Sequence, residues 1–243
     1  MKAAEKARLY VPDALAPGAA VTLGAEQHHY LRNVLRLAEG DAVTLFNGRD
    51  GEYSARIEKL GKKEAIAAVA TQLRPFAPAA DIWLCFAPIR QGRIEFIVEK
   101  ATELGVGRLL PVQTQRSQIG RVNTDRLSAH AREAAEQCER LDVPQIAAAT
   151  SLDDLLATWP AERRLFFCVE RGAADALLGA AQAWPKAAPC GLLVGPEGGF
   201  APAEQDRVRA LPQAVPVSLG GTILRAETAA IAALAILQSV RQN

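Results

Sequence analysis

Two glycine-rich stretches late in the chain hold the residues best suited to binding and chemistry. The first is Gly191–Phe200 (GLLVGPEGGF), in which an apolar run leads into three glycines, a proline and Glu197. Glycines that follow a parallel strand let backbone amides approach a ligand closely, at the sheet edge where α/β folds bind ligands. An ordinary strand-to-helix turn does not require three glycines around one glutamate. We therefore favour a ligand-binding loop here.

The second stretch, Ser218–Ala229 (SLGGTILRAETA), also leaves an apolar run through glycines and enters an expected helix. Glu227 suits the start of that helix because the helix dipole favours an anion there, whereas Arg225 does not. Arg225 therefore needs a carboxylate or a phosphate as its partner, and Glu197 or Glu227 could supply the carboxylate. An internal ion pair and a catalytic role for Arg225 carry equal weight.

Other catalytic patterns are missing from the sequence. It has no G-x-x-x-x-G-K-[ST] loop and no G-x-S-x-G elbow, and Gly105-Val106-Gly107 follows a helical pattern rather than a strand, which excludes a nicotinamide fingerprint. The histidines lack zinc-ligand spacing, so we expect no metal site. The cysteines Cys85, Cys138, Cys168 and Cys190 form no C-x-x-C pair and are expected to be buried and reduced, as in a cytoplasmic protein.

The first 74 residues read as a small β-barrel with one helical interruption at Glu26–Leu35. The segment Asn47–Gly51 (NGRDG) is a strong hairpin signal. Five short strands in about 70 residues favour a barrel. The expected strands are Arg8–Val11, Ala20–Leu23, Asp41–Phe46, Glu52–Leu60 and Glu64–Leu73.

Beyond a linker at Arg74–Pro78, strands alternate with helices. This alternation predicts a mostly parallel sheet covered on both faces. The expected strands are Ile82–Pro88, Leu109–Val112, Leu165–Val169, Gly191–Val194 and Val215–Leu219. The expected helices are Arg93–Leu104, Asp125–Arg140, Ala174–Ala183, Ala203–Leu211 and Ala226–Val240.

The charge balance excludes a polybasic nucleic-acid coat. The 243 residues hold 28 Lys and Arg against 27 Asp and Glu, a net charge of +1. Residues 1–74 nevertheless carry +2, and Arg108–Arg132 carries a local +4 through five arginines. This local excess of arginine is compatible with RNA contact, although a compositional preference for arginine over lysine on a solvated face explains it as well. Apolar runs are too short to span a membrane, and we expect no secretory signal.

Taken together, the two stretches closely resemble the signature of the bacterial small-subunit ribosomal RNA (uracil-N3) methyltransferases of the SPOUT superfamily. Three further segments agree with it, in the family's order: His28–Arg36, Lys100–Val106 and Glu133–Gln137. The sequence departs from the family pattern at Gly221-Thr222 and at Gln115.

The resemblance implies a PUA-like RNA-binding barrel over residues 1–74 and a SPOUT domain over residues 75–243, with a trefoil knot at about 165–240. It implies S-adenosylmethionine as methyl donor, a homodimer, and N3-methyluridine in 16S ribosomal RNA of the small subunit as product, in the cytoplasm. The residues implied to hold the cofactor are Cys168, Leu193, Val194, Gly195, Gly199, Leu219, Gly220, Ile223, Leu224 and Thr228.

Methylation of uracil N3 requires that its proton leave, so the site needs a base or a cation that stabilises the developing anion. We assign the cation to Arg225, and Glu197 either to proton removal or to holding Arg225. The residues expected on RNA are Arg8, His29, Arg32, Arg36, Arg116 and Arg121. Two alternatives stay open: a knotted methyltransferase acting on a ribose 2′-hydroxyl or a guanine, and a non-catalytic RNA-binding assembly factor.

Overall fold

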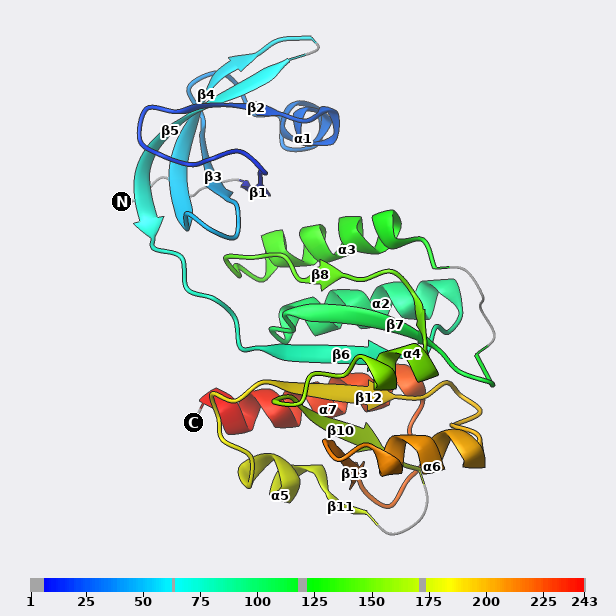
Figure 1. Cartoon of the computed structure of the whole chain (residues 1–243). Helices are drawn as coiled ribbons and strands as arrows, with labels where there is room; N and C mark the ends of the chain where they lie inside the picture. Colours follow the sequence, from blue (N-terminus) through cyan, green and yellow to red (C-terminus); the bar gives the residue numbers. More distant parts are fainter. Residues whose placement is uncertain (1–6, 63, 118–121, 171–173, 243) are drawn as a thin grey trace. The chain divides into compact units, whose positions relative to one another are not determined.

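The computed structural model describes residues 7–62, 64–117, 122–170 and 174–242 (Figure 1). The chain forms two compact units. The first comprises the chain up to Pro78 together with Ala135–Val143, and the second comprises Ala79–Ala134 and Pro144 onward. The predicted domain boundary after Arg74 lies close to the first of these divisions, but the packing of residues 135–143 with the barrel was not predicted.

The first unit is built on a five-stranded sheet in the order β1-β3-β4-β5-β2. β1 pairs with β3 in parallel and the other pairs are antiparallel. Alternate apolar side chains such as Leu9, Val43, Leu45 and Ile57 face one core. All five strands agree with the predicted ones: β1 (Arg8–Tyr10), β2 (Ala20–Leu23), β3 (Ala42–Phe46), β4 (Glu52–Leu60) and β5 (Ala65–Arg74).

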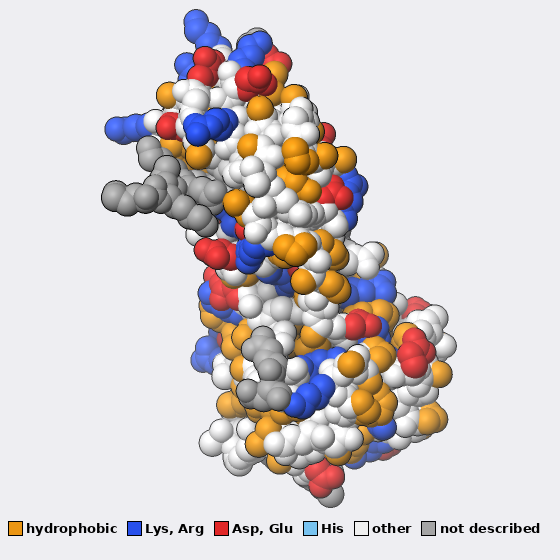
Figure 2. Space-filling model, turned by 90° about the vertical axis from the view of Figure 1, so that its left-hand side faces the viewer, with side chains coloured by type: hydrophobic (Ala, Val, Ile, Leu, Met, Phe, Trp, Pro, Cys, Tyr) orange, Lys and Arg blue, Asp and Glu red, His pale blue; other side chains and the backbone are white. Residues whose placement is uncertain are grey.

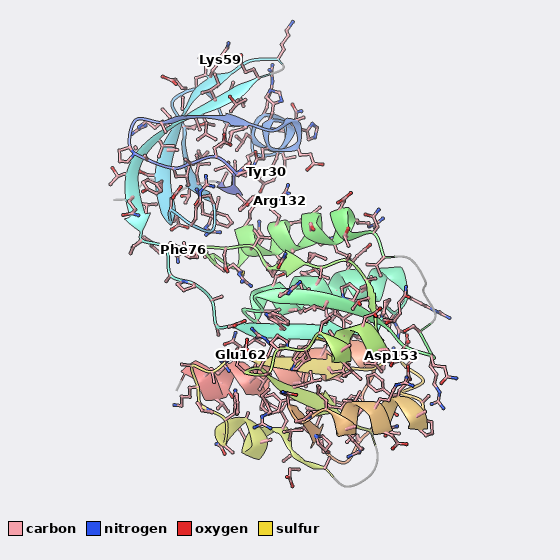
Figure 3. The ribbon with its side chains drawn as sticks, viewed as in Figure 1. Tyr30, Lys59, Phe76, Arg132, Asp153 and Glu162 are labelled. Carbon is pink, nitrogen blue, oxygen red and sulfur yellow. The ribbon has the colours of Figure 1, made fainter. Side chains whose placement is uncertain are left out.

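The helical interruption is an α-helix followed by a π-helix rather than one regular helix. α1 spans Ala25–His29 and the π-helix η1 spans Tyr30–Val34, where the Leu35 amide donates to the Tyr30 carbonyl oxygen at 2.9 Å. Tyr30 packs against the barrel core (Figure 3). Leu31 is buried in that core, while Arg32 and Val34 are exposed. π-Helical turns of this kind are frequent at functional sites.

Arg8 and Glu52 fasten residues 135–143 to the barrel. The Arg8 guanidinium lies 2.6 Å from Glu52 Oε1 and donates to the carbonyl oxygens of Ala135 (2.8 Å) and Arg140 (2.6 Å). It also stacks 3.8 Å from the ring centroid of Phe46. Arg74 Nε donates to Glu52 Oε2 at 2.7 Å. Because these bonds join distant stretches of sequence, no local pattern could have predicted them.

The second unit is built on an eight-stranded sheet in which every strand pair is parallel, which confirms the predicted fold class. Its order is β11-β13-β10-β12-β6-β7-β8, with β9 paired to β7. The two-residue strands β8, β9 and β11 were not predicted, since they are too short to show a period. The strands are β6 (Ile82–Phe86), β7 (Arg108–Gln113), β8 (Gln145–Ile146), β9 (Thr150–Ser151), β10 (Arg164–Cys168), β11 (Asp175–Ala176), β12 (Cys190–Val194) and β13 (Ala214–Ser218).

Helices cover both faces of this sheet. On one face Phe167 and Leu193 pack in a cluster with Leu155 of α4 and Val208 of α6. The neighbouring strand residues are also buried but lie outside this cluster, and α7 packs on β12 with α2 and α5 beside it (Figure 1). The helices are α2 (Gln91–Glu103), α3 (Thr124–Gln137), α4 (Leu152–Ala157), α5 (Leu177–Gln182), α6 (Pro202–Ala210) and α7 (Ala226–Gln242).

Several predictions about these elements need correction. α4 was missed, although Ser151 caps it by accepting a bond from the Asp154 amide at 3.0 Å. α5 begins later than predicted because β11 pairs with β13. Cys85 and Cys190 are buried as expected, but Cys138 is exposed. The trefoil knot stays a prediction.

Figure 2 shows basic and acidic side chains interspersed over the face that it displays. This mixture agrees with the near-neutral total charge. No helix in the described part of the chain is long and apolar enough to cross a membrane.

Candidate functional site

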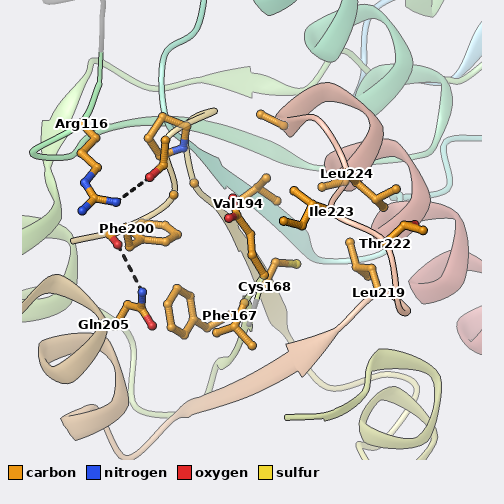
Figure 4. Close-up of a pocket in the computed structure, with 18 of the residues that line it drawn as sticks. Arg116, Phe167, Cys168, Val194, Phe200, Gln205, Leu219, Thr222, Ile223 and Leu224 are labelled. Carbon is orange, nitrogen blue, oxygen red and sulfur yellow. Dashed lines mark hydrogen bonds between the residues drawn. The ribbon is translucent and has the colours of Figure 1, made fainter. Parts of the chain in front are cut away.

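A cavity opens at the carboxyl ends of β10, β12 and β13, between the loops that follow these neighbouring strands (Figure 4). Including the solvent space at its mouth, the cavity has a volume of about 910 Å³. Both glycine-rich stretches contribute to it, as the sequence predicted. The lining consists of Arg116, Phe167, Cys168, Val169, Glu170, Val194, Gly195, Pro196, Gly198, Gly199, Phe200, Gln205, Leu219, Gly220, Thr222, Ile223, Leu224, Ala226 and Ala229.

One wall of the cavity is aromatic. Phe167 and Phe200 meet edge to face with ring centroids 5.0 Å apart, and Gln205 Nε2 donates to the Phe200 carbonyl oxygen at 3.2 Å (Figure 4). Gly195 makes this packing possible, because a Cβ at that position would lie 2.7 Å from Cε2 of Phe200. The absent side chain of Gly195 thus makes room for a protein ring, not for a ligand as the sequence suggested.

The opposite wall is the loop after β13. Gly220 has φ +124°, a conformation that other residues rarely adopt, and a Cβ there would meet nothing within 4 Å. Ile223 is 58% exposed although it lines the cavity. Thr222 also lines it, so the departure of Gly221-Thr222 from the family pattern reaches the pocket itself.

Two charged side chains line the cavity, on either side of the Gly198-Gly199 pair. The Arg116 guanidinium donates to the Gly198 carbonyl oxygen at 2.7 Å (Figure 4). The carboxylate oxygens of Glu170 lie 3.4 Å from the position that a Cβ on Gly199 would occupy. Glu170 was not predicted as a site residue, although its place just after a strand in the middle of the parallel sheet was an available signal.

Cys168 contributes an uncharged thiol to the cavity. Burial raises its pKa to about 12, so the thiol stays protonated at neutral pH. It is therefore a small, weakly polar contact surface rather than a nucleophile.

Most of the residues that the family resemblance assigns to the cofactor line this cavity. Two do not. The side chain of Leu193 is fully buried in the core cluster under the cavity, and Thr228 is exposed on α7 outside the lining. The eight that line it are Cys168, Val194, Gly195, Gly199, Leu219, Gly220, Ile223 and Leu224.

Arg225 and Glu197, the predicted catalytic pair, do not contact each other through any ion pair of the described residues. Arg225 is exposed, and its chain neighbours Leu224 and Ala226 both line the cavity, so it sits at the rim. Glu197 instead lies 3.8 Å from Nη1 of Arg93, which also lies 3.4 Å from Glu227. Glu197 and Glu227, the two carboxylates that were candidate partners for Arg225, thus pair with Arg93, which was not among the predicted site residues.

The predicted RNA residues fall into different environments. Arg8 is nearly buried and engaged by three internal acceptors, so we withdraw it from the RNA-binding set. His29, Arg32 and Arg36 are exposed on and just after α1 and η1, and Arg32 donates to the Gly61 carbonyl oxygen. Arg116 lies at the cavity, and Arg121 falls outside the described residues.

Two family models match this chain, one over its larger C-terminal part and one within its N-terminal part. Residues 77–238 match the model of an RNA methyltransferase domain, and residues 23–70 match that of an RNA methyltransferase PUA domain. The chain is 33% identical over 229 residues to ribosomal RNA small subunit methyltransferase E of Rickettsia conorii, covering 94% of this chain and 93% of that protein. It is 28% identical to the same-named protein of Bacillus subtilis, covering 89% and 88%.

A solved structure is similar throughout. It is a ribosomal RNA small subunit methyltransferase E from Neisseria gonorrhoeae bound to S-adenosyl methionine, with a TM-score of 0.86 and 29% identity, covering 97% of this chain and 98% of that one.

Proposed function

Since the chain belongs to the ribosomal RNA small subunit methyltransferase E family, we propose that it transfers a methyl group from S-adenosylmethionine to N3 of one uridine in 16S ribosomal RNA. The observation that carries the proposal is the cavity at the carboxyl ends of β10, β12 and β13, lined by both glycine-rich stretches. It combines a lining of glycine backbone and aromatic rings with an exposed arginine at its rim.

The lining suits S-adenosylmethionine. The Phe167 and Phe200 rings with Val194 and Leu219 offer an apolar surface to the adenine, and the Glu170 carboxylate complements the donor's ammonium or sulfonium charge. The donor supplies an electrophilic methyl group, so the protein chiefly aligns the reactants and excludes water. Gly195, Gly199 and Gly220 present backbone without a side chain to the cavity, and the amides of Gly199 and Gly220 already donate to the Pro196 carbonyl oxygen at 2.9 Å and to Ser218 Oγ at 3.2 Å.

Arg225 acts on the substrate in this proposal. Removal of the N3 proton leaves negative charge on uracil, spread over the flanking carbonyl oxygens, and the guanidinium of Arg225 stabilises that charge. Arg225 is available for this because no ion pair among the described residues engages it. Glu197, 28% exposed and beside Arg93, is the acceptor we propose for the N3 proton.

The RNA is held by cations of the barrel and of the cavity rim. N3 is hidden in a Watson–Crick pair, so the target uridine must be unpaired or flipped, which costs a few kcal/mol. We propose that His29, Arg32 and Arg36 contact the surrounding RNA, with Arg116 near the donor. We further propose that the enzyme acts as a homodimer on the small ribosomal subunit in the cytoplasm. The exposed Phe96 (42%) offers apolar surface to a partner subunit.

The test is methyl transfer from labelled S-adenosylmethionine to small subunits isolated from cells that lack this protein. Wild-type protein should add one methyl group, and nucleoside analysis should identify it as N3-methyluridine. Arg225→Ala should lose at least about 100-fold in turnover, as for loss of an oxyanion-stabilising group, with the donor Kd unchanged by calorimetry. Unchanged turnover would overturn the role of Arg225. A ribose or guanine product would favour another target, and no donor binding would favour a non-catalytic assembly factor.

A further inference from the structure

Arg93 lies at an electrostatically unfavourable position in α2. It lies in the first turn of α2, which contains no acidic residue, and a cation there opposes the helix dipole. Its guanidinium is 37% exposed and bridges two carboxylates from other parts of the unit, Glu227 at 3.4 Å and Glu197 at 3.8 Å. The two contacts supply the negative charge that the first turn of α2 lacks.

Both carboxylates come from the two glycine-rich stretches, one of which also holds Arg225. Glu227 lies two residues after it in the first turn of α7, and Glu197 comes from the other glycine-rich stretch at the cavity. Glu227 is only 14% exposed, and its Oε2 is buried with no hydrogen-bond partner among the described residues. A poorly solvated carboxylate with an unfilled acceptor attracts any cation within reach.

We propose that Arg93 is a positioning residue: by pairing with Glu227 and Glu197 it keeps these carboxylates from capturing Arg225, and so leaves the Arg225 guanidinium free for the substrate. Without Arg93, two negative charges stand beside the one cation that the reaction requires. The inference rests on the proposed function, because it concerns how Arg225 is kept available.

The first measurement separates turnover from binding. Arg93→Ala should lower kcat by about tenfold or more, while the donor Kd stays within about twofold of the wild-type value. Arg93→Lys, which keeps the charge but not the fork, should recover part of the loss. If Arg93→Ala keeps the wild-type kcat, the inference is wrong.

The second measurement removes the competing carboxylate. In the Arg93→Ala background, Glu227→Gln should bring kcat back to within about threefold of the Glu227→Gln single variant, a coupling that a double-mutant cycle isolates. A merely structural role would recover the melting temperature together with kcat, because Glu227→Gln also removes the unpaired charge; kcat is therefore compared at temperatures at which all the variants are fully folded, where only the proposal predicts a loss and its recovery. Absence of recovery therefore overturns the proposal even if Arg93→Ala alone is slow.

Controls keep the two proposals apart. Arg207→Ala breaks an ion pair of similar type, with Asp153 at 2.9 Å, away from the cavity lining (Figure 3), and should leave kcat unchanged. Melting curves report whether each variant is folded, and Arg93→Lys serves if Arg93→Ala is not. If wild-type protein methylates no uridine, the proposed function fails. If wild-type is active and Arg93→Ala equals it, only the present inference fails.

Discussion

Substituting Gly195 by alanine tests whether the aromatic wall of the cavity depends on that missing side chain. The new Cβ would lie 2.7 Å from Cε2, 2.9 Å from Cδ2 and 3.3 Å from Cζ of Phe200. The ring would have to withdraw by about 0.7 Å to reach an ordinary contact of 3.4 Å. It has little freedom to do so, because Phe200 is 5% exposed and packs edge to face on Phe167.

Overpacking of this kind costs about 1–3 kcal/mol. Phe200 lines the cavity, so we expect the displaced ring to reduce its space and the loss to appear in donor binding. At about 1.4 kcal/mol per factor of ten, the affinity for S-adenosylmethionine should fall by roughly 5-fold to 150-fold. Titration calorimetry with S-adenosylmethionine measures this change, and thermal unfolding reports any accompanying loss of stability.

A matched control lies in the second glycine-rich stretch. Gly221→Ala adds the same methyl group where nothing lies within 4 Å, and it should leave donor affinity within about twofold of the wild-type value. Replacing Phe200 by leucine in the Gly195→Ala background shortens the obstructing side chain and should recover part of the affinity. A Gly195→Ala protein that binds the donor like wild type refutes this account of the wall.

Three further outcomes follow from the structure. Burial would raise the pKa of Glu52, but hydrogen bonds from Arg74 and Arg8, with their charges, lower it overall. The stability that this carboxylate provides should therefore be complete above about pH 4.3 and disappear as the pH falls further. The melting temperatures of wild type and Glu52→Gln should then converge in acid. The thiol of Cys168, with its pKa raised to about 12, should resist iodoacetamide at pH 8 while the exposed Cys138 reacts, as peptide mass mapping would reveal; rapid labelling of Cys168 contradicts this. Arg32→Ala should weaken binding to small subunits and reduce its salt slope with no effect on donor binding, and an unchanged slope would remove η1 from the RNA interface.

The strands and both cavity loops were predictable because their signals are local. The five barrel strands, the hairpin at Asn47–Gly51 and the start of α6 at Pro202 follow from alternation, turn residues and proline placement over a few positions. The order of strands in a parallel sheet then brings the loops after β10, β12 and β13 to one edge. Eight of the ten expected cofactor residues line the cavity for this reason.

Charge partners were not predictable, because each depends on residues distant in sequence. Glu197 and Glu227 were candidate partners for Arg225, with a catalytic role for Arg225 equally open, yet α2 brings Arg93 to both carboxylates. Arg8 was expected on RNA, yet Glu52 and the carbonyl oxygens of Ala135 and Arg140 surround it. In both cases sequence reasoning identified the charges correctly but could not decide which cation each carboxylate would receive.

Arginines of the segment Arg108–Arg132 also have partners that are distant in sequence. Arg108 stacks 4.7 Å from the ring centroid of Trp83, Arg126 lies 2.6 Å from Glu95, and Arg116 is bonded to the Gly198 carbonyl oxygen. A local charge of +4 is therefore not a free basic patch, since all four of its arginines in the described part of the chain already interact within the protein. An RNA interface with few free cations releases few counterions, so binding must depend more on the shape of the target than on its charge. An enzyme that modifies one uridine in a long RNA needs that kind of recognition.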